Sequence, residues 1–348
     1  MSRFFSLVTA MTAGLAAVSA QAAENLTAET AGPGGAPYTT IISLGELASK
    51  AGIANFQVLD SQTLTNSLQN VAEGKSDVAA APFILPFLLS KGAGPYAKLG
   101  KAKGAELAGN LAVLYTYRFG GMSLYAYDSS SVKGWGDLKG KRVINGPPRG
   151  AALANARAMT KIITGLTDGK DYKGVQANWG QMVKFITDGS GDAMVLPVYF
   201  PDIRITRGLA SGSITLHSVP QKAWESAGMK KYLKSPGTGS FVLDLAKVKP
   251  QAGLTIKSED GTWRSPATVG GDVVHRKMDF KLAKALTKTV ITNISFVKAK
   301  GAFMEHVGIG ELDPAVTGMC GPNPIKYHPG SVAAWEEAGH KVPDCAKP

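Results

Sequence analysis

The chain has 348 residues, of which 44% are hydrophobic and 18% are charged, a composition typical of globular proteins. Its length is enough for about two domains. The formal net charge is +12 at pH 7, but the lysines and arginines are scattered, with no dense basic run and no alternation of basic with aromatic residues. This distribution argues against nucleic-acid binding. It is compatible with a plain basic surface or with attraction of a small anionic ligand.

The first 22 residues have the features of a secretory signal peptide. Arg3 precedes an uncharged apolar run from Phe4 to Val18, and Ala20-Gln21-Ala22 matches the small-residue cleavage pattern. We expect cleavage near Ala22 and a periplasmic mature protein, with an uncleaved signal anchor as the alternative. No cysteine follows the run, so the sequence does not indicate a lipid anchor.

The predicted elements then alternate between strand and helix. A loose arm to Ala31 and a Gly- and Pro-rich turn at 32–38 precede a helix over 39–48, whose apolar positions recur at helical spacing. A strand over 56–59, a helix from Leu64 that stops at Gly74, and a buried strand over 78–81 follow. This order predicts an α/β unit with a parallel sheet.

The rest of the chain repeats this alternation. Strands are predicted at 111–117 and 122–127, on either side of Gly120-Gly121, then at 142–145, 175–179 and 193–196, with helices at 151–164 and 181–187. Beyond residue 240 we expect strands at 241–245 and 269–274, a polar hairpin at 257–264 and a long helix at 280–296.

The two halves of this pattern predict an α/β fold with two lobes. Lobe one comprises residues 23–120 plus 241–348, and lobe two comprises residues 121–240. Strands that cross between the lobes would act as a hinge around an interlobe cleft. Strand C-termini and helix N-termini face such a cleft, and a Gly-rich loop occupies that position in each half.

The Gly-rich loop of lobe two, 146–150, is the first candidate binding site. It contains Pro148, Arg149 and Gly150, and a helix is expected to begin at Ala151. The first N–H groups of a helix have no intrahelical partners and bind anions readily. The Arg149 guanidinium could pair with a carboxylate through two hydrogen bonds. The alternative is a plain turn with an exposed arginine.

Three other segments are candidates for the cleft. In 34–39, Gly35, Tyr38 and Thr39 could bind ligand opposite the first loop, or Tyr38 could pack in the core. In 61–66, Ser61 or Thr63 could contact ligand or cap the following helix. In 197–201, Val198 and Tyr199 could form an apolar cleft wall or belong to the core.

No familiar catalytic, metal or cofactor motif is present. The Gly140-Lys141 segment is not a phosphate-binding P-loop, because it precedes a strand and lacks Ser or Thr after the lysine. The five histidines have no metal-binding spacing, and no G-x-S-x-G or H-E-x-x-H occurs. We therefore expect a protein that is not an enzyme and has no metal or cofactor.

The two cysteines, Cys320 and Cys345, both lie near the C-terminus. An oxidising compartment would allow them to form a disulfide that ties the C-terminal segment to the body of the protein.

Four ordered features resemble the TAXI family of TRAP-transporter solute receptors. They are the signal peptide, the Gly34-Gly35-x-x-Tyr38 loop before a helix, Asp137-Leu-Lys-Gly-Lys-Arg-Val143 followed by a Gly-rich loop, and His328-Pro-Gly330 before a terminal helix. The segment 184–193 is also similar to that family, and the resemblance covers about residues 32–338. It implies a type II periplasmic binding protein (Venus-flytrap) fold that delivers a solute, often an organic acid or acidic amino acid, to an ion-gradient-driven permease.

The resemblance points to the same loops. It implicates Gly35, Tyr38 and 61–65 in lobe one, and 148–152 with Val198 and Tyr199 in lobe two. The chain departs from the family's Gly-Thr-Gly-Gly start, from its small second-lobe loop and from its Thr-Gly-Gly-Ser segment, which reads Ser61-Gln-Thr-Leu64 here. Pro148 and Arg149 replace small residues, so Arg149 could strengthen a preference for an anion.

Three hypotheses follow. The first is a periplasmic receptor for a dicarboxylate, oxo acid or acidic amino acid, with a TRAP-type permease as partner. The second is an exported ligand sensor or scaffold on the same fold, and the third is an enzyme on that fold.

Overall fold

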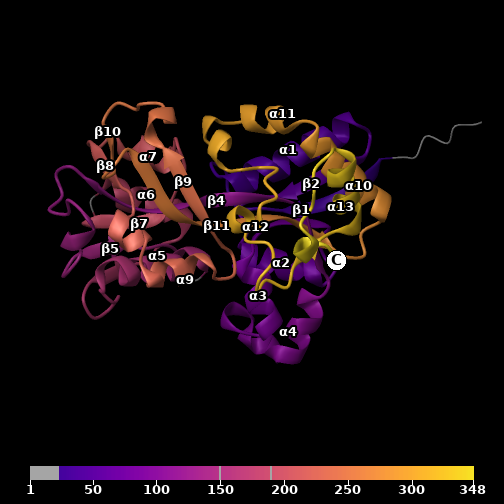
Figure 1. Cartoon of the computed structure of the whole chain (residues 1–348), viewed down its shortest axis with the longest axis horizontal. Coiled ribbons are helices and arrows are strands. Elements are labelled where there is room, and N and C mark those ends of the chain that lie inside the picture. Colours follow the sequence, from indigo (N-terminus) through magenta and orange to yellow (C-terminus); the bar gives the residue numbers. More distant parts are fainter. Residues whose placement is uncertain (1–22, 149, 189) are drawn as a thin grey trace, which may run out of the picture.

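The computed structural model describes residues 23–148, 150–188 and 190–348. The predicted signal peptide and Arg149 lie outside these residues. The described chain forms two halves joined by the long strands β4 (Leu111–Tyr127) and β11 (Thr262–His275) (Figure 1). None of its helices has the length and apolar character needed to cross a membrane.

All strands belong to one sheet, whose main path runs β2-β1-β3-β11-β4-β7-β5-β6. In the first half, β1 (Glu24–Glu29) pairs in parallel with β2 (Ala54–Leu59) and β3 (Val78–Pro82). The second half has a matching parallel group. It consists of β5 (Arg142–Ile144), β6 (Lys173–Val175) and β7 (Ala193–Val198). Antiparallel pairing of β4 with β11 joins the two groups, which confirms the predicted two-lobed α/β fold.

Helices cover both parallel groups and mostly match the predicted positions. They include α1 (Ala36–Lys50), α2 (Leu64–Ala72) and α5 (Ala151–Thr164), and α1 buries its predicted apolar face, Ile41, Leu44, Leu47 and Ala48. Other elements are α3 (Ile84–Lys91), α4 (Gly100–Ala108), α7 (Ile203–Gly208), α8 (Gln221–Trp224), α9 (Ala227–Leu233), α12 (Pro314–Thr317), α13 (Pro329–Glu337), β8 (Ile214–His217), β9 (Thr238–Asp244), β12 (Lys326–Tyr327) and the 3-10 turn η4 (Ala302–His306).

The prediction of two strands around Gly120-Gly121 is wrong, because both glycines lie within the single strand β4. Gly120 has φ +94°, and a Cβ on Gly121 would lie 2.5 Å from the Trp263 ring and 2.8 Å from that of Phe241. A Gly pair normally suggests a turn. Here the missing side chains allow two aromatic rings to approach the strand backbone.

The expected loose arm before Ala31 is also wrong, because residues 24–29 form β1 between β2 and β3. Leu26 and Ala28 are buried while Glu24 and Asn25 are exposed. Such a short and partly polar segment becomes a strand only because two neighbouring strands satisfy its backbone N–H and C=O groups.

Three later boundaries also differ. Segment 257–264 is not a hairpin, since β10 (Leu254–Lys257) pairs in parallel with β8 while β11 pairs with β9. Residues 176–179 leave the sheet, because the Asn178 side chain accepts a hydrogen bond from Gln181 N and caps α6 (Trp179–Thr187). The predicted helix 280–296 divides at Thr292-Asn293 into α10 (Phe280–Ile291) and α11 (Ile294–Ala299).

Two hydrophobic clusters fill the molecule. The larger one extends through the first half and the crossing strands, and the smaller one is confined to the second half, where it includes Leu124, Trp135 and Met159. A disulfide joins Cys320 to Cys345, with 5.4 Å between their Cα atoms, and links the C-terminal end of the chain to the loop after α12.

Candidate functional site

The loops after β1 and β2 lie side by side at the C-terminal edge of the first parallel group. Gln62 N donates to the Thr30 carbonyl over 2.9 Å, and a Cβ on Gly32 would be 3.4 Å from Ser61 Oγ. Ser61 and Thr63 are both exposed, and Thr63 makes no side-chain capping bond to α2 although it precedes that helix. The structure therefore places Ser61 and Gln62 beside the turn that leads into segment 34–39.

The N-terminus of α1 faces out of this edge without a polar cap. Gly35 is the residue before the helix and, as a glycine, has no side chain with which to cap it. The first turn of α1 contains no acidic residue. The Thr39 hydroxyl donates to the Gly35 carbonyl over 3.1 Å, so it is directed at the backbone, while Tyr38 is half-buried. A helix end of this kind carries partial positive charge.

Tyr199, which directly follows β7, meets this helix end from lobe two. Its hydroxyl accepts a hydrogen bond from Ala36 N over 3.3 Å, and a Cβ on Gly35 would lie 3.5 Å from the same oxygen. Its ring packs against Phe303, with 5.1 Å between ring centroids, and the residue is only 8% exposed. Burial raises the pKa of Tyr199, so its hydroxyl is neutral at physiological pH.

Buried groups on both sides position Tyr199. Asp202 accepts from Tyr199 N over 3.2 Å and pairs with Arg204 at 2.7 Å. Phe200 packs edge-on against Trp263, with 4.8 Å between centroids. Val198 is fully buried in β7, so whether it belongs to the cleft wall stays a prediction.

The predicted loop of lobe two also ends at an uncapped helix. Pro148 and Gly150 are exposed. Gly150 directly precedes α5 and has no side chain to cap it, and the first turn of α5 contains no acidic residue. Behind the loop, Asn145 is fully buried and accepts a hydrogen bond from Gln176 Nε2 over 2.8 Å. Helix α5 begins at the half-buried Ala151. The dipole at this second helix N-terminus favours an anion.

Both helices are attached to the same crossing strand, β11. In the first turns of α1, Thr40 Oγ1 donates to Asp272 Oδ1 over 3.3 Å. From α5, Asn155 Nδ2 donates to Thr268 Oγ1 over 2.7 Å. Asp272 follows Thr268 by four positions along the extended strand, so the two residues lie about 13 Å apart.

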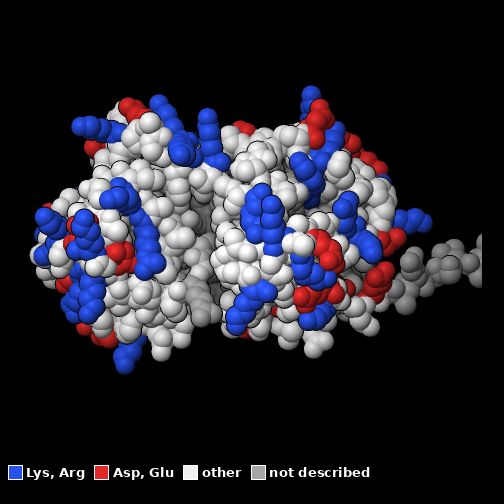
Figure 2. Space-filling model, turned by 90° about the horizontal axis from the view of Figure 1, so that it is seen from below, with Lys and Arg blue, Asp and Glu red and all other residues white. Residues whose placement is uncertain are grey.

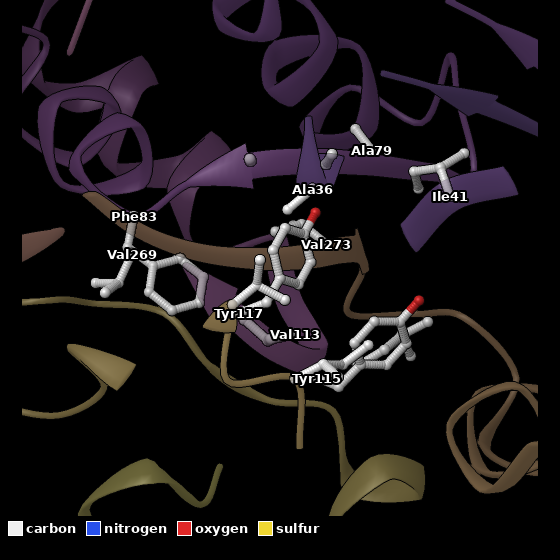
Figure 3. Close-up of a cluster of buried hydrophobic side chains, with 14 of the residues drawn as sticks. Ala36, Ile41, Ala79, Phe83, Val113, Tyr115, Tyr117, Val269 and Val273 are labelled. Atoms are coloured by element: carbon white, nitrogen blue, oxygen red, sulfur yellow. The ribbon is translucent and has the colours of Figure 1, made fainter. Parts of the chain in front are cut away.

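Asp272 is a buried carboxylate that the sequence analysis did not single out. It accepts hydrogen bonds from the hydroxyls of Tyr115, Tyr117 (2.7 Å) and Thr40, and it has no exposed surface. Burial raises its pKa to about 6, although the three hydroxyl groups oppose that shift. Figure 3 shows Tyr117 extending toward Ala36 at the start of α1. The signal in the sequence is a single acidic residue inside an otherwise apolar strand.

Sequence analysis also missed Phe303 and Trp179. Phe303 comes from η4, far along the chain from Tyr199, and no local pattern connects the two. Trp179 is 42% exposed at the start of α6, and the Arg204 guanidinium lies 5.3 Å from its ring centroid. An exposed tryptophan beside a positioned arginine is an apolar surface with a polar edge.

The surface between the halves is hollowed and basic. Figure 2 shows a groove between them, with Lys and Arg side chains on both sides. Within the described part of the chain, no group of three or more His, Cys, Asp or Glu side chains could hold a metal ion. The site thus offers hydrogen-bond donors, helix dipoles and aromatic surface.

Two α/β lobes joined by crossing strands form a fold that matches that of periplasmic solute-binding proteins. The chain belongs to the NMT1-like family, whose model matches residues 28–339.

Solved structures similar to this chain are periplasmic binding proteins. The aliphatic sulphonate binding protein SsuA from Escherichia coli is 11% identical, with 82% of this chain and 79% of that chain covered and a TM-score of 0.43. The ectoine-binding protein of the TeaABC TRAP transporter from Halomonas elongata is 10% identical, with 90% of both chains covered and a TM-score of 0.42. A TRAP solute binding protein from Shewanella oneidensis with bound succinate is 9% identical, covers 82% and 81%, and has a TM-score of 0.45.

Similarities this distant carry no argument about the ligand of this chain. Among curated proteins, none matches it in sequence.

Proposed function

We propose that this protein is an extracytoplasmic receptor that binds a small anionic organic solute and delivers it to a TRAP-type, ion-gradient-driven permease. The solute class is a dicarboxylate, an oxo acid or an acidic amino acid. In this proposal the protein is a TAXI-type receptor and catalyses no reaction. Its first 22 residues direct export to the periplasm and are then removed.

The observation that carries the proposal is the pair of uncapped helix N-termini. The α1 and α5 ends have no acidic residue in their first turns, neither helix is capped by the residue before it, and each helix is bonded to β11. The two attachment points lie about 13 Å apart along the strand, so one strand supports a helix from each lobe. The net charge of +12 would favour approach of such a solute.

Each lobe would supply one side of the site. Lobe one, 23–120 plus 241–348, would contribute Gly35, Tyr38, Thr39, Ser61 and Thr63. Lobe two, 121–240, would contribute Pro148, Arg149, Gly150, Ala151 and Tyr199. A solute that contacts both lobes binds the closed form better than the open form, and therefore shifts the population toward closure. The permease would recognise that closed form.

Tyr199 has a particular role in this proposal. Its hydroxyl already accepts a hydrogen bond from the first N–H of α1. A solute carboxylate would replace it there or bind beside it, and a charged acceptor makes the stronger bond. The tyrosine would therefore hold the lobes together weakly until solute arrives.

Thermal unfolding tests the proposal. The protein is unfolded and refolded to remove any bound solute, and is then melted in the presence of single organic acids and amino acids. A solute that binds only the folded state, at 100 times its Kd, stabilises the protein by about 2.7 kcal/mol. A higher melting temperature with one acidic solute, confirmed by calorimetry, supports the receptor. A shift with neutral or cationic solutes only would refute the anionic class, and turnover of the bound solute would support an enzyme.

A further inference from the structure

A second pocket lies in lobe two, away from the α1 and α5 helix ends. It has a volume of about 290 Å³ and is formed by β8, β10 and the segment after β4, at the end of the second half farthest from β1 and β2 (Figure 1). Its polar lining residues are Asp128, Lys133, Thr215, His217, Thr255 and Lys257.

Strand register explains why four of these residues lie together. The parallel pairing of β8 with β10 sets Thr215 beside Thr255 and His217 beside Lys257. Because side chains alternate between the two faces of a strand, all four project from the same face of the sheet. Two hydroxyl groups, an imidazole and an ammonium group therefore share one surface.

His217 is nine-tenths buried but incompletely bonded. It is 7% exposed, and its Nε2 atom has no hydrogen-bond partner among the described residues. Most buried polar atoms do have a partner, so an unpaired nitrogen in a residue that lines a pocket is able to bond to a ligand or a water. Burial and the neighbouring Lys257 lower the pKa of His217 to about 4, against the effects of Asp137 and Asp128, so the ring is neutral at pH 7 and can donate from one nitrogen.

The charges in the pocket leave a positive excess. Asp128 already accepts a hydrogen bond from Thr215 Oγ1 over 2.6 Å, and its backbone carbonyl accepts one from Lys133 Nζ. The Lys257 backbone carbonyl accepts a hydrogen bond from Ser218 N over 2.9 Å, but its ammonium group makes no ion pair or hydrogen bond within the residues that the structure describes. The lining thus contains two ammonium groups against the single Asp128 carboxylate, and the Lys257 ammonium and the Thr255 hydroxyl are donors without a partner among the described residues.

We propose that this pocket binds a small oxyanion, of the size of phosphate, sulfate or a short carboxylate, as a second site independent of the interlobe cleft. Lys257 and Lys133 neutralise the anion, and the Thr255 hydroxyl and the His217 ring bind its oxygen atoms. The volume is at the lower end of the range for small-molecule sites, which fits an anion of this size.

Inorganic phosphate is the probe, titrated by calorimetry at pH 7.5 with ionic strength held constant by sodium chloride. We expect saturable binding of one phosphate in this pocket. Lys257→Ala removes a charged partner and should weaken binding about tenfold or more. Thr255→Val should weaken it less, since a neutral donor is lost. Lys249→Ala, an exposed lysine outside the pocket, is the matched control and should bind as the parent does.

Histidine ring NMR signals give a second readout. Phosphate should shift the His217 signal, identified by its loss in His217→Gln, and should raise the pH at which that ring titrates. Lys257 and Thr255 are exposed, so their variants keep the test valid if the buried His217 substitution prevents folding. Tyr199→Phe, in the interlobe region, should leave phosphate binding unchanged.

Three results would overturn the inference. They are absence of saturable phosphate binding, equal weakening by Lys257→Ala and Lys249→Ala, or loss of binding in Tyr199→Phe with retention in Lys257→Ala. The last result would place the anion in the cleft, which would support the proposed function while refuting the second site.

Discussion

Replacement of Asp272 by asparagine should change how the stability of this protein depends on pH. The carboxyl group is fully buried, and burial raises its pKa from 3.8 to about 6. Between these pH values the folded state binds more protons at this group than the unfolded state does. The contribution of Asp272 to stability is therefore fully present below about pH 4 and is lost as the pH rises through 6. A difference of about two pH units corresponds to about 3 kcal/mol.

Urea unfolding from pH 4 to pH 8 measures this effect. The free energy of unfolding of the parent, minus that of Asp272→Asn, should fall by about 3 kcal/mol across the range. Taking the difference removes the opposite contribution of other carboxylates such as Asp168, whose pKa is lowered despite its partial burial because Arg157 and Gly174 N donate to it. Asp244→Asn, at an exposed carboxylate, is the matched control and should track the parent. Parallel pH profiles for the parent and Asp272→Asn would refute the reasoning.

Three further substitutions test other parts of the structure. Tyr199→Phe removes the acceptor for Ala36 N but keeps the ring, so we expect the free energy of unfolding by urea to fall by about 0.5–1.5 kcal/mol; no change would mean that this bond does not hold the lobes together. Arg149→Ala should weaken an anionic solute by about 1.5–3 kcal/mol in calorimetry if the side chain binds it, and unchanged affinity would remove Arg149 from the site. Replacement of Cys320 and Cys345 by serine opens a loop of 25 residues and should cost about 3 kcal/mol in urea unfolding, whereas equal stability with and without a reductant in the parent would contradict that value.

Much of the local structure could be predicted from the sequence. The helix at 151–164 begins and ends where apolar spacing and the flanking glycines place it, and the core face of α1 is the one that the same spacing predicts. These elements depend on residues close together in the chain. The loops at Gly35, Ser61 and Gly150 could be found for the same reason, since each lies between a strand and a helix.

Elements that depend on distant partners could not be predicted in this way. Residues 24–29 became a central strand because β2 and β3 lie on either side of them. Strand β4 continues through Gly120-Gly121 because Trp263 and Phe241 fill the space above Gly121, and Pro197 and Val198 lie against Gly120. In both places the local sequence favours a different structure, and packing with distant residues prevails.

The candidate site also combines features that the local sequence predicts with contacts between distant residues. The sequence by itself determined which loops lead from a strand into a helix N-terminus, because a strand followed by glycines and then by a helix is a local pattern. Only the tertiary structure decided that the Tyr199 hydroxyl meets the start of α1, that Phe303 packs on its ring, and that Asp272 is enclosed by hydroxyl groups. Each of these contacts joins residues more than 100 positions apart, so its existence depends on the register and crossing of β4, β7 and β11, which no local pattern encodes.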